Sequence, residues 1–184
     1  ENVDSNKDYD RYCENNKFIG NIVTRIGSSS AYVYGGGLVL MDYGGNCYIR
    51  NNSFINNHAD TRSGGIDLCR PYINEVIVEN NYIIGNSSQN GGGLGVFNAK
   101  VRLQNNVFSG NHASGNGGAA YLYKDASILV DHIETFINNS FSGNKANSAG
   151  GAIFSSNANP LIFNSIFWND SSINGQEIFL SSIY

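Results

Sequence analysis

The residues Gln104-Asn105-Asn106-Val107-Phe108-Ser109-Gly110-Asn111 form a phrase that recurs along the chain and decides its fold. The other copies share an Asn pair or Asn-Ser, a central apolar residue and a closing Asn or Asp, at Glu14–Asn21, Arg50–Asn57, Glu79–Asn86, Ile137–Asn144 and Phe163–Asp170. The first Asn of each copy stands at position 15, 51, 80, 105, 138 or 164. A period of about 25 residues with additions in some copies is typical of a solenoid repeat.

A second phrase, glycines opening an apolar run, follows the first in each period. Its copies are Gly35–Leu38, Gly64–Ile66, Gly91–Leu94, Gly117–Ala120 and Gly150–Ile153, with a reduced copy at Gly175-Gln176. The first and fourth periods are longer than the others, and their additional residues lie near 22–34 and 124–134. Additions to a solenoid become loops on one face, which is often the binding face.

Each period contains three short segments with sequences typical of β-strands. One follows the glycines, one ends at Asn-Asn, and one surrounds the Phe. They are too short and too glycine-rich for helices, and Val101, Leu103 and Asn105 follow two-residue alternation. Three short strands per period predict an all-β fold, a single right-handed parallel β-helix of about six coils.

Equivalent residues of successive coils should stack at the ~4.8 Å spacing of neighbouring strands. The position two before the first Asn is apolar in all copies, as Cys13, Ile49, Val78, Leu103, Phe136 and Ile162. A phenylalanine column is expected from Phe18, Phe54, Phe108, Phe141 and Phe167, with Ile83 in the third copy. The same parity predicts an inner asparagine ladder of Asn15, Asn51, Asn80, Asn105, Asn138 and Asn164. Stacked amides can satisfy one another, whereas a buried amide without a partner costs about 1–3 kcal/mol.

The paired phrases also resemble a known family. Gly150-Gly151-Ala152-Ile153 together with Phe-x-x-Asn at Phe18–Asn21, Phe54–Asn57, Phe108–Asn111 and Phe141–Asn144 resembles the repeats of chlamydial-type polymorphic membrane proteins. The resemblance covers nearly the whole chain and implies a β-helix, export and a place at the cell surface. It is weak as a guide to activity, because β-helices serve as adhesins, structural fibres and polysaccharide lyases.

Composition excludes several classes of partner. The chain has 184 residues, 29 Asn, 22 Gly, a net charge of −4 and no basic run, so nucleic acid is not expected as a partner. No stretch approaches the ~20 apolar residues of a membrane-spanning helix. The spacing of Cys13, Cys47 and Cys69 matches no zinc motif, and we expect small apolar packing residues there. Neither a metal nor a cofactor is predicted.

The two ends of the repeat differ in polarity. Residues 1–13 are polar and charged, as expected of an N-terminal cap or lead-in, and residues 14–184 form the predicted β-helix. The last residues, from Glu177 to Tyr184, stay apolar. An uncapped coil exposes strand edges, so we expect either a longer native chain or end-to-end association.

An outward aromatic row is predicted on the strand after the glycines. If Leu94 and Ala120 point inward, then Phe97, Tyr121, Tyr123 and Phe154 point outward. Such a row could stack against sugar rings, which makes these four residues the binding candidates. The alternative is that a covering loop packs over them, and the fourth-coil insertion is well placed to do so.

Catalytic candidates on the same face are Asp42, Asp67 and Arg70, since a polysaccharide lyase needs carboxylates for a cation and a base. Asp42 and Asp67 are out of register by about three residues, or roughly 10 Å, which is loose for a metal pair. His58 and His112 stand two coils apart, too far to share one ion.

We therefore expect a non-catalytic extracellular or cell-surface module, structural or adhesive, that either assembles end to end or continues into a longer chain. The alternative is a β-helix protein that binds or degrades polysaccharide. The two differ in whether acidic and aromatic residues converge in one groove.

Overall fold

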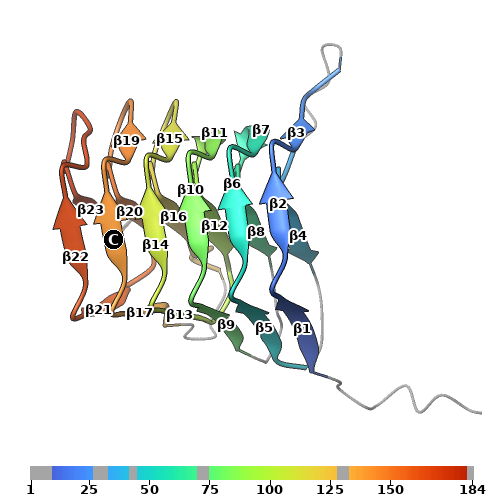
Figure 1. Ribbon diagram of the computed structural model, residues 1–184. Helices are drawn as coiled ribbons and strands as arrows, with labels where there is room; N and C mark the ends of the chain where they lie inside the picture. Colours follow the sequence, from blue (N-terminus) through green and yellow to red (C-terminus); the bar gives the residue numbers. More distant parts are fainter. Residues whose placement is uncertain (1–9, 27–32, 42–44, 70–74, 128–132, 182–184) are drawn as a thin grey trace, which may run out of the picture.

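The computed structural model describes residues 10–26, 33–41, 45–69, 75–127 and 133–181 and contains only strands and turns in these ranges. Every strand pairs in parallel with the equivalent strand of the next coil, which gives four parallel sheets. The chain winds through these sheets in turn, as a right-handed parallel β-helix whose coils lie side by side (Figure 1). The predicted fold class of about six coils is confirmed. No helix in the described ranges is long and apolar enough to cross a membrane.

The first two sheets contain the strands on either side of the Asn pair. The first sheet consists of β1 (Arg11–Glu14), β5 (Cys47–Arg50), β9 (Val76–Glu79), β13 (Val101–Gln104), β17 (Thr135–Ile137) and β21 (Leu161–Phe163). The second sheet consists of β2 (Lys17–Ile19), β6 (Ser53–Ile55), β10 (Tyr82–Ile84), β14 (Val107–Ser109), β18 (Ser140–Ser142) and β22 (Ile166–Trp168).

The other two sheets lie before and after the glycines. The third sheet consists of β3 (Ile22–Val23), β7 (His58–Arg62), β11 (Ser87–Asn90), β15 (His112–Ala113) and β19 (Lys145–Ala146). The fourth sheet consists of β4 (Leu38–Met41), β8 (Ile66–Cys69), β12 (Leu94–Phe97), β16 (Ala120–Tyr123), β20 (Ile153–Ser156) and β23 (Ile178–Ser181). Five of the six coils therefore contain one strand more than the predicted three. The missed strand follows the closing Asn, where its polar residues resemble a loop in sequence.

Stacked columns of equivalent side chains fill the interior. Ile49, Val78, Leu103 and Phe136 of the first sheet are fully buried and aligned by the strand register. On the second sheet the rings stack face to face, with centroids 4.7 Å apart for Phe18–Phe54, 4.8 Å for Phe108–Phe141 and 4.7 Å for Phe141–Phe167. The cysteines are unpaired; Cys47 is buried in the apolar core, and Cys69 is buried outside it.

The asparagine ladder is one residue away from the predicted position. The expected ladder residues are exposed and have a positive φ, at 60° for Asn15, 56° for Asn51, 57° for Asn80, 56° for Asn105, 54° for Asn138 and 47° for Asn164. Each occupies the left-handed turn that ends a strand of the first sheet, a conformation that Asn tolerates well. This turn interrupts the two-residue alternation, so the next residue points inward instead.

The second Asn of each pair forms the ladder, as Asn16, Asn52, Asn81, Asn106 and Asn139, with Ser165 in the sixth coil. Asn106 is typical. Its Nδ2 donates to Asn139 Oδ1 at 3.0 Å and to the Val78 carbonyl at 2.8 Å, and its Oδ1 accepts from the Asn81 backbone N–H and from Asn81 Nδ2. The closing residues form a second ladder of the same kind, from Asn21 through Asn57, Asn86, Asn111 and Asn144 to Asp170.

The boundaries of the domain prediction can be compared with the strands. β1 begins at Arg11 and pairs in register with β5, so the first coil begins inside the expected lead-in of residues 1–13. Of the two insertions, residues 27–32 and 128–132 lie outside the described residues.

Candidate functional site

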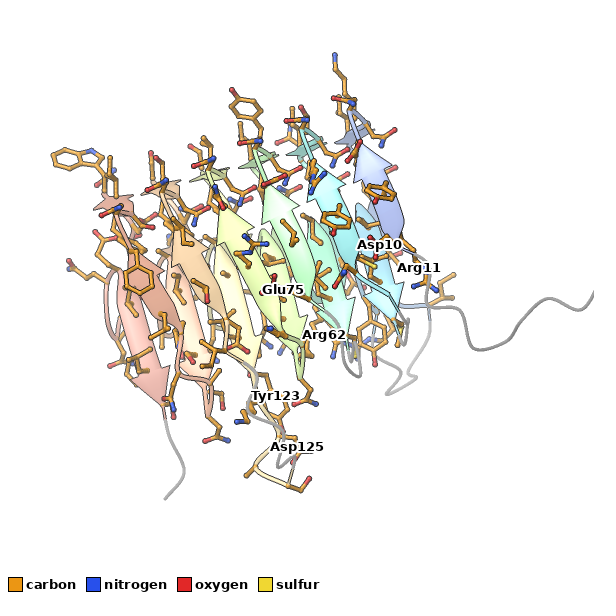
Figure 2. The ribbon with its side chains drawn as sticks, turned by 90° about the horizontal axis from the view of Figure 1, so that it is seen from below. Asp10, Arg11, Arg62, Glu75, Tyr123 and Asp125 are labelled. Atoms are coloured by element: carbon orange, nitrogen blue, oxygen red, sulfur yellow. The ribbon has the colours of Figure 1, made fainter. Side chains whose placement is uncertain are left out.

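A continuous outer stack crosses all six coils beside the fourth sheet, with one side chain from each coil. Its members are Tyr34, Arg62, Phe97, Tyr121, Phe154 and Phe179. The Arg62 guanidinium carbon lies 4.1 Å from the centroid of the Tyr34 ring and 3.5 Å from that of Phe97. The following ring centroids are 5.6, 5.2 and 5.6 Å apart. Figure 2, seen from below, shows Arg62 and Tyr123 on the same side of the coils.

The stack covers the faces of its own rings. Tyr121 stacks on Phe97 on one side and on Phe154 on the other, and Phe154 stacks on Phe179 as well. Three of the four predicted binding residues, Phe97, Tyr121 and Phe154, therefore present ring edges rather than open faces to the outside. Tyr123 differs, since its in-register neighbours are Phe97, at a tilted 6.2 Å, and the small Ser156.

Asp67 is completely buried under the outer stack and paired with Arg62. Arg62 Nε donates to Asp67 Oδ2 at 2.8 Å and Arg62 Nη2 donates to Oδ1 at 2.9 Å, while the Ser63 hydroxyl donates to Oδ2 at 2.8 Å. Burial raises the pKa of Asp67, and the contacts with Arg62 and Ser63 oppose that rise. With both oxygens engaged, Asp67 is a structural anion here rather than a free base or metal ligand. The other two catalytic candidates, Asp42 and Arg70, lie outside the described residues.

The surface is hollowed where the third coil departs from the repeat. Gly95 occupies the column position that Asp67 and Tyr121 fill in the adjacent coils, and an added Cβ would lie 2.0 Å from Ser63 Oγ and 2.6 Å from the Phe97 ring. Phe97 thus fills the space that a side chain at position 95 would need. The third coil is also one residue shorter before the glycines, because Ser88 pairs with Ala59 but Asn90 pairs with Arg62.

These departures leave a hollow of about 420 Å³ over the third coil, here called the third-coil hollow. Its lining residues are Thr61, Arg62, Gln89, Asn90, Phe97, Tyr121 and Tyr123. Three of the four predicted binding residues line it, whereas the amides of Gln89 and Asn90 were missed by the sequence analysis. The available signals were a glycine in an otherwise occupied outward column and a third copy that is one residue short.

A hydrogen-bonded chain of polar groups, also missed, lies on the third sheet. His58 Nδ1 lies 2.9 Å from Ser87 Oγ, and His58 Nε2 lies 3.1 Å from Asp60 Oδ1. The Arg25 backbone N–H and His58 both donate to Asp60 and lower the pKa of its carboxyl. The order of groups resembles a nucleophile, base and acid, but the Ser87 backbone N–H donates to Asn57 O and is not free to stabilise an oxyanion. These three side chains therefore form a hydrogen-bonded network at the surface. No group of three potential metal ligands is assembled among the described residues.

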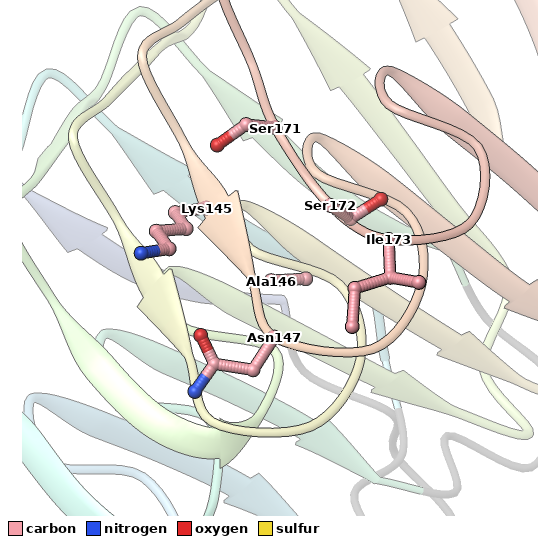
Figure 3. Close-up of a pocket in the computed structure, with 6 residues that line it drawn as sticks. All are labelled: Lys145, Ala146, Asn147, Ser171, Ser172 and Ile173. Atoms are coloured by element: carbon pink, nitrogen blue, oxygen red, sulfur yellow. The ribbon is translucent and has the colours of Figure 1, made fainter.

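A second hollow of about 380 Å³ lies where the fifth coil meets the sixth. Figure 3 shows Lys145, Ala146 and Asn147 of one coil beside Ser171, Ser172 and Ile173 of the next. Its described lining contains neither a buried charge nor an aromatic ring, so it offers less for ligand binding than the third-coil hollow.

Two carboxyl groups meet in the sixth coil, where Asp170 replaces Asn in the closing ladder. Asp170 Oδ1 accepts from the Asn144 backbone N–H and from Asn144 Nδ2, while Asp170 Oδ2 and Glu177 Oε2 are buried atoms without a hydrogen-bond partner in the part of the chain that the structure describes. Burial and the adjacent Asp170 raise the pKa of Glu177 to about 7. Glu177 therefore holds its proton to a higher pH than an ordinary glutamate does.

We expect this pair to make the sixth coil less stable as the pH rises. Glutamate titrates near 4.5 in the unfolded chain, so the stabilisation is complete below about pH 4.5 and is lost as the pH approaches 7. At about pH 8, Glu177→Gln should exceed the wild type in unfolding free energy by about 1 kcal/mol, a value reduced for solvent screening. At about pH 5 the two should be equal.

Trp168 is the only tryptophan of the chain and lies in β22, so its fluorescence reports urea unfolding of this coil. Glu14→Gln, in the first coil, is the control and should show no comparable gain at high pH. Equal stability of the wild type and Glu177→Gln at both pH values would refute the raised pKa of Glu177.

Comparison of the chain with protein-family models, with curated proteins and with solved structures found no match in any of the three.

Proposed function

We propose that the protein is a non-catalytic β-helix module, structural or adhesive, that works outside the cell or at its surface. The single observation that carries this proposal is that the stacked side chains continue without a break along the helix. Two hydrogen-bonded ladders and an outer stack connect the coils from first to sixth, which suits a rigid rod that presents its faces. The resemblance of the paired phrases to polymorphic membrane protein repeats supports the location.

The ends of the rod support a second part of the proposal, association end to end or with further coils of a longer chain. Strands β21, β22 and β23 pair on one side only among the described residues, and Ile166, Trp168 and Leu180 of these strands are exposed. In the closing ladder each Asn Nδ2 donates toward the sixth coil, so this ladder ends at Asp170, which has no further coil beyond it among the described residues.

The alternative function is degradation of polysaccharide. It predicts cleaved polymers, whereas a non-catalytic module would leave them intact, and one experiment distinguishes the two. The purified protein is incubated with neutral and acidic polysaccharides, with and without calcium, and the products are analysed by mass spectrometry. We expect the polymers to remain intact, because Asp67 is neutralised by Arg62. Defined oligosaccharide products that disappear in Asp67→Asn would overturn the proposal. Electron microscopy of the same preparation tests end-to-end association, because stacked copies would form rods longer than a single chain.

A further inference from the structure

We propose that the third-coil hollow binds a neutral saccharide, one or two sugar units of a glycan chain lying across the second to fourth coils. The inference rests on the proposed adhesive role and names the ligand class and the site through which the module would adhere. It is carried by four features of the hollow, namely its charge, its free polar groups, its shape and its rigidity.

The charge of the lining selects a neutral ligand. Among the described lining residues Arg62 alone has a charge at neutral pH, and Asp67 neutralises it through two hydrogen bonds. Burial raises the pKa of Tyr121, so its phenol stays protonated. An acidic sugar would therefore find no unpaired cation in the lining, and an ammonium group would find no free carboxylate.

The polar groups that remain free in the hollow suit hydroxyl groups. The Gln89 side chain is exposed, and Asn90 Oδ1 accepts from the Asn116 backbone N–H at 3.1 Å, which leaves Asn90 Nδ2 as a donor. The phenols of Tyr121 and Tyr123 make no hydrogen bond with any described residue. Amides and phenols can each donate and accept, as the hydroxyl groups of a sugar require.

The shape of the hollow fits a small ring with apolar C–H groups. Its volume of about 420 Å³ lies near the lower end of the roughly 300–1,000 Å³ typical of ligand pockets. Phe97 and the tyrosine edges supply apolar surface, and because the stack covers the faces of Phe97 and Tyr121, the ligand contacts these two rings at their edges. Only Tyr123 has a ring outside the stack.

The walls of the hollow are held in place before any ligand arrives. Arg62 is fixed between two rings and by Asp67, Tyr121 is fixed between Phe97 and Phe154, and both stand on paired strands. A site that is rigid before binding loses less entropy on association. The two departures from the repeat, at Gly95 and before the glycines, coincide at this one place, and in repeat proteins local departures of this kind tend to mark functional sites.

The test is titration calorimetry of the full chain with the tetrasaccharides of β-1,4-glucose, β-1,4-xylose, β-1,4-mannose and α-1,4-glucose, and with tetragalacturonate as the acidic probe. We expect at least one neutral tetrasaccharide to bind with a Kd between the micromolar and millimolar levels, and tetragalacturonate to bind at least tenfold more weakly. Gln89→Ala and Tyr123→Phe should each weaken binding about tenfold, the effect of one lost hydrogen bond.

The matched controls are Gln104→Ala and Tyr82→Phe, on the first and second sheets, which should bind as the wild type does. Circular dichroism confirms that each variant is folded. Absence of binding by all four neutral probes, equal binding of tetragalacturonate, or equal losses in the control variants would overturn the inference. Mass spectrometry of the titrated samples separates the two proposals, because cleaved tetrasaccharides would refute the non-catalytic function, whereas intact and unbound ones would refute the saccharide site alone.

Discussion

Asn106→Ala should lower the free energy of unfolding by about 3–5 kcal/mol, whereas Asn105→Gly at the adjacent position should change it by less than about 0.5 kcal/mol. The substituted residues are neighbours of the same type. They differ in that Asn106 is 1% exposed and belongs to the ladder, while Asn105 is exposed and has a φ of 56°.

The loss at Asn106 comes from the groups that its side chain satisfies. Alanine would leave the Asn81 backbone N–H without its acceptor, and would remove one partner each from the Val78 carbonyl and from the side chains of Asn81 and Asn139. Each buried polar group left unpaired costs about 1–3 kcal/mol. At Asn105, by contrast, glycine adopts the left-handed conformation without strain.

Urea unfolding followed by circular dichroism measures both values. Asn105→Ala is a useful third variant and should cost about 1 kcal/mol, since alanine tolerates the positive φ poorly. A result in which Asn105→Gly destabilises as much as Asn106→Ala would contradict the assignment of the ladder to the second Asn.

The Asn pair also shows how far the sequence could predict the fold. The spacing of the phrases predicted the parallel coils, because six copies in phase can stack in only one register. Two-residue alternation placed Leu103 and Phe108 in the core, each within its strand. It failed at Asn105 because the strand β13 ends at Gln104 and the left-handed turn resets the alternation. The alternation of inward and outward side chains holds within a strand and not across a turn.

The candidate site was less predictable for a different reason. Parity within β12 and β16 identified Phe97, Tyr121 and Tyr123 as outward residues, and three of the residues that line the hollow follow from it. The approach of Arg62 to Asp67 depends on β7 meeting β8 around the glycine turn, and the burial of Phe97 depends on the space left by Gly95. These contacts join neighbouring coils at a corner, where strand periodicity makes no prediction.

The Arg62–Asp67 pair gives the second large effect. Arg62→Leu should lower the free energy of unfolding by about 3–5 kcal/mol, because it leaves a completely buried carboxylate without its cation. Arg102→Leu is the matched control, since Arg102 pairs with Glu75 at 3.2 Å with both side chains partly exposed, and it should cost less than about 1 kcal/mol.

A double variant separates the lost charge from lost packing. Arg62→Leu combined with Asp67→Leu removes both charges, and replacement of a buried pair by apolar residues is often close to neutral, so the double variant should recover most of the stability. The remaining deficit measures the stacking of the guanidinium between Tyr34 and Phe97.

The pH dependence of Arg62→Leu provides an independent check. Arg62 normally opposes the burial that raises the pKa of Asp67, so its removal should raise that pKa further. A carboxyl with a raised folded pKa loses stability as the pH rises, and the deficit of Arg62→Leu should therefore be smaller at about pH 4 than at about pH 7. If Arg62→Leu cost no more than Arg102→Leu at neutral pH, Asp67 would have to be solvated or free of its partner. A free carboxyl at the edge of the third-coil hollow would then be available as a base, and the degradative alternative would regain the group that the ion pair denies it.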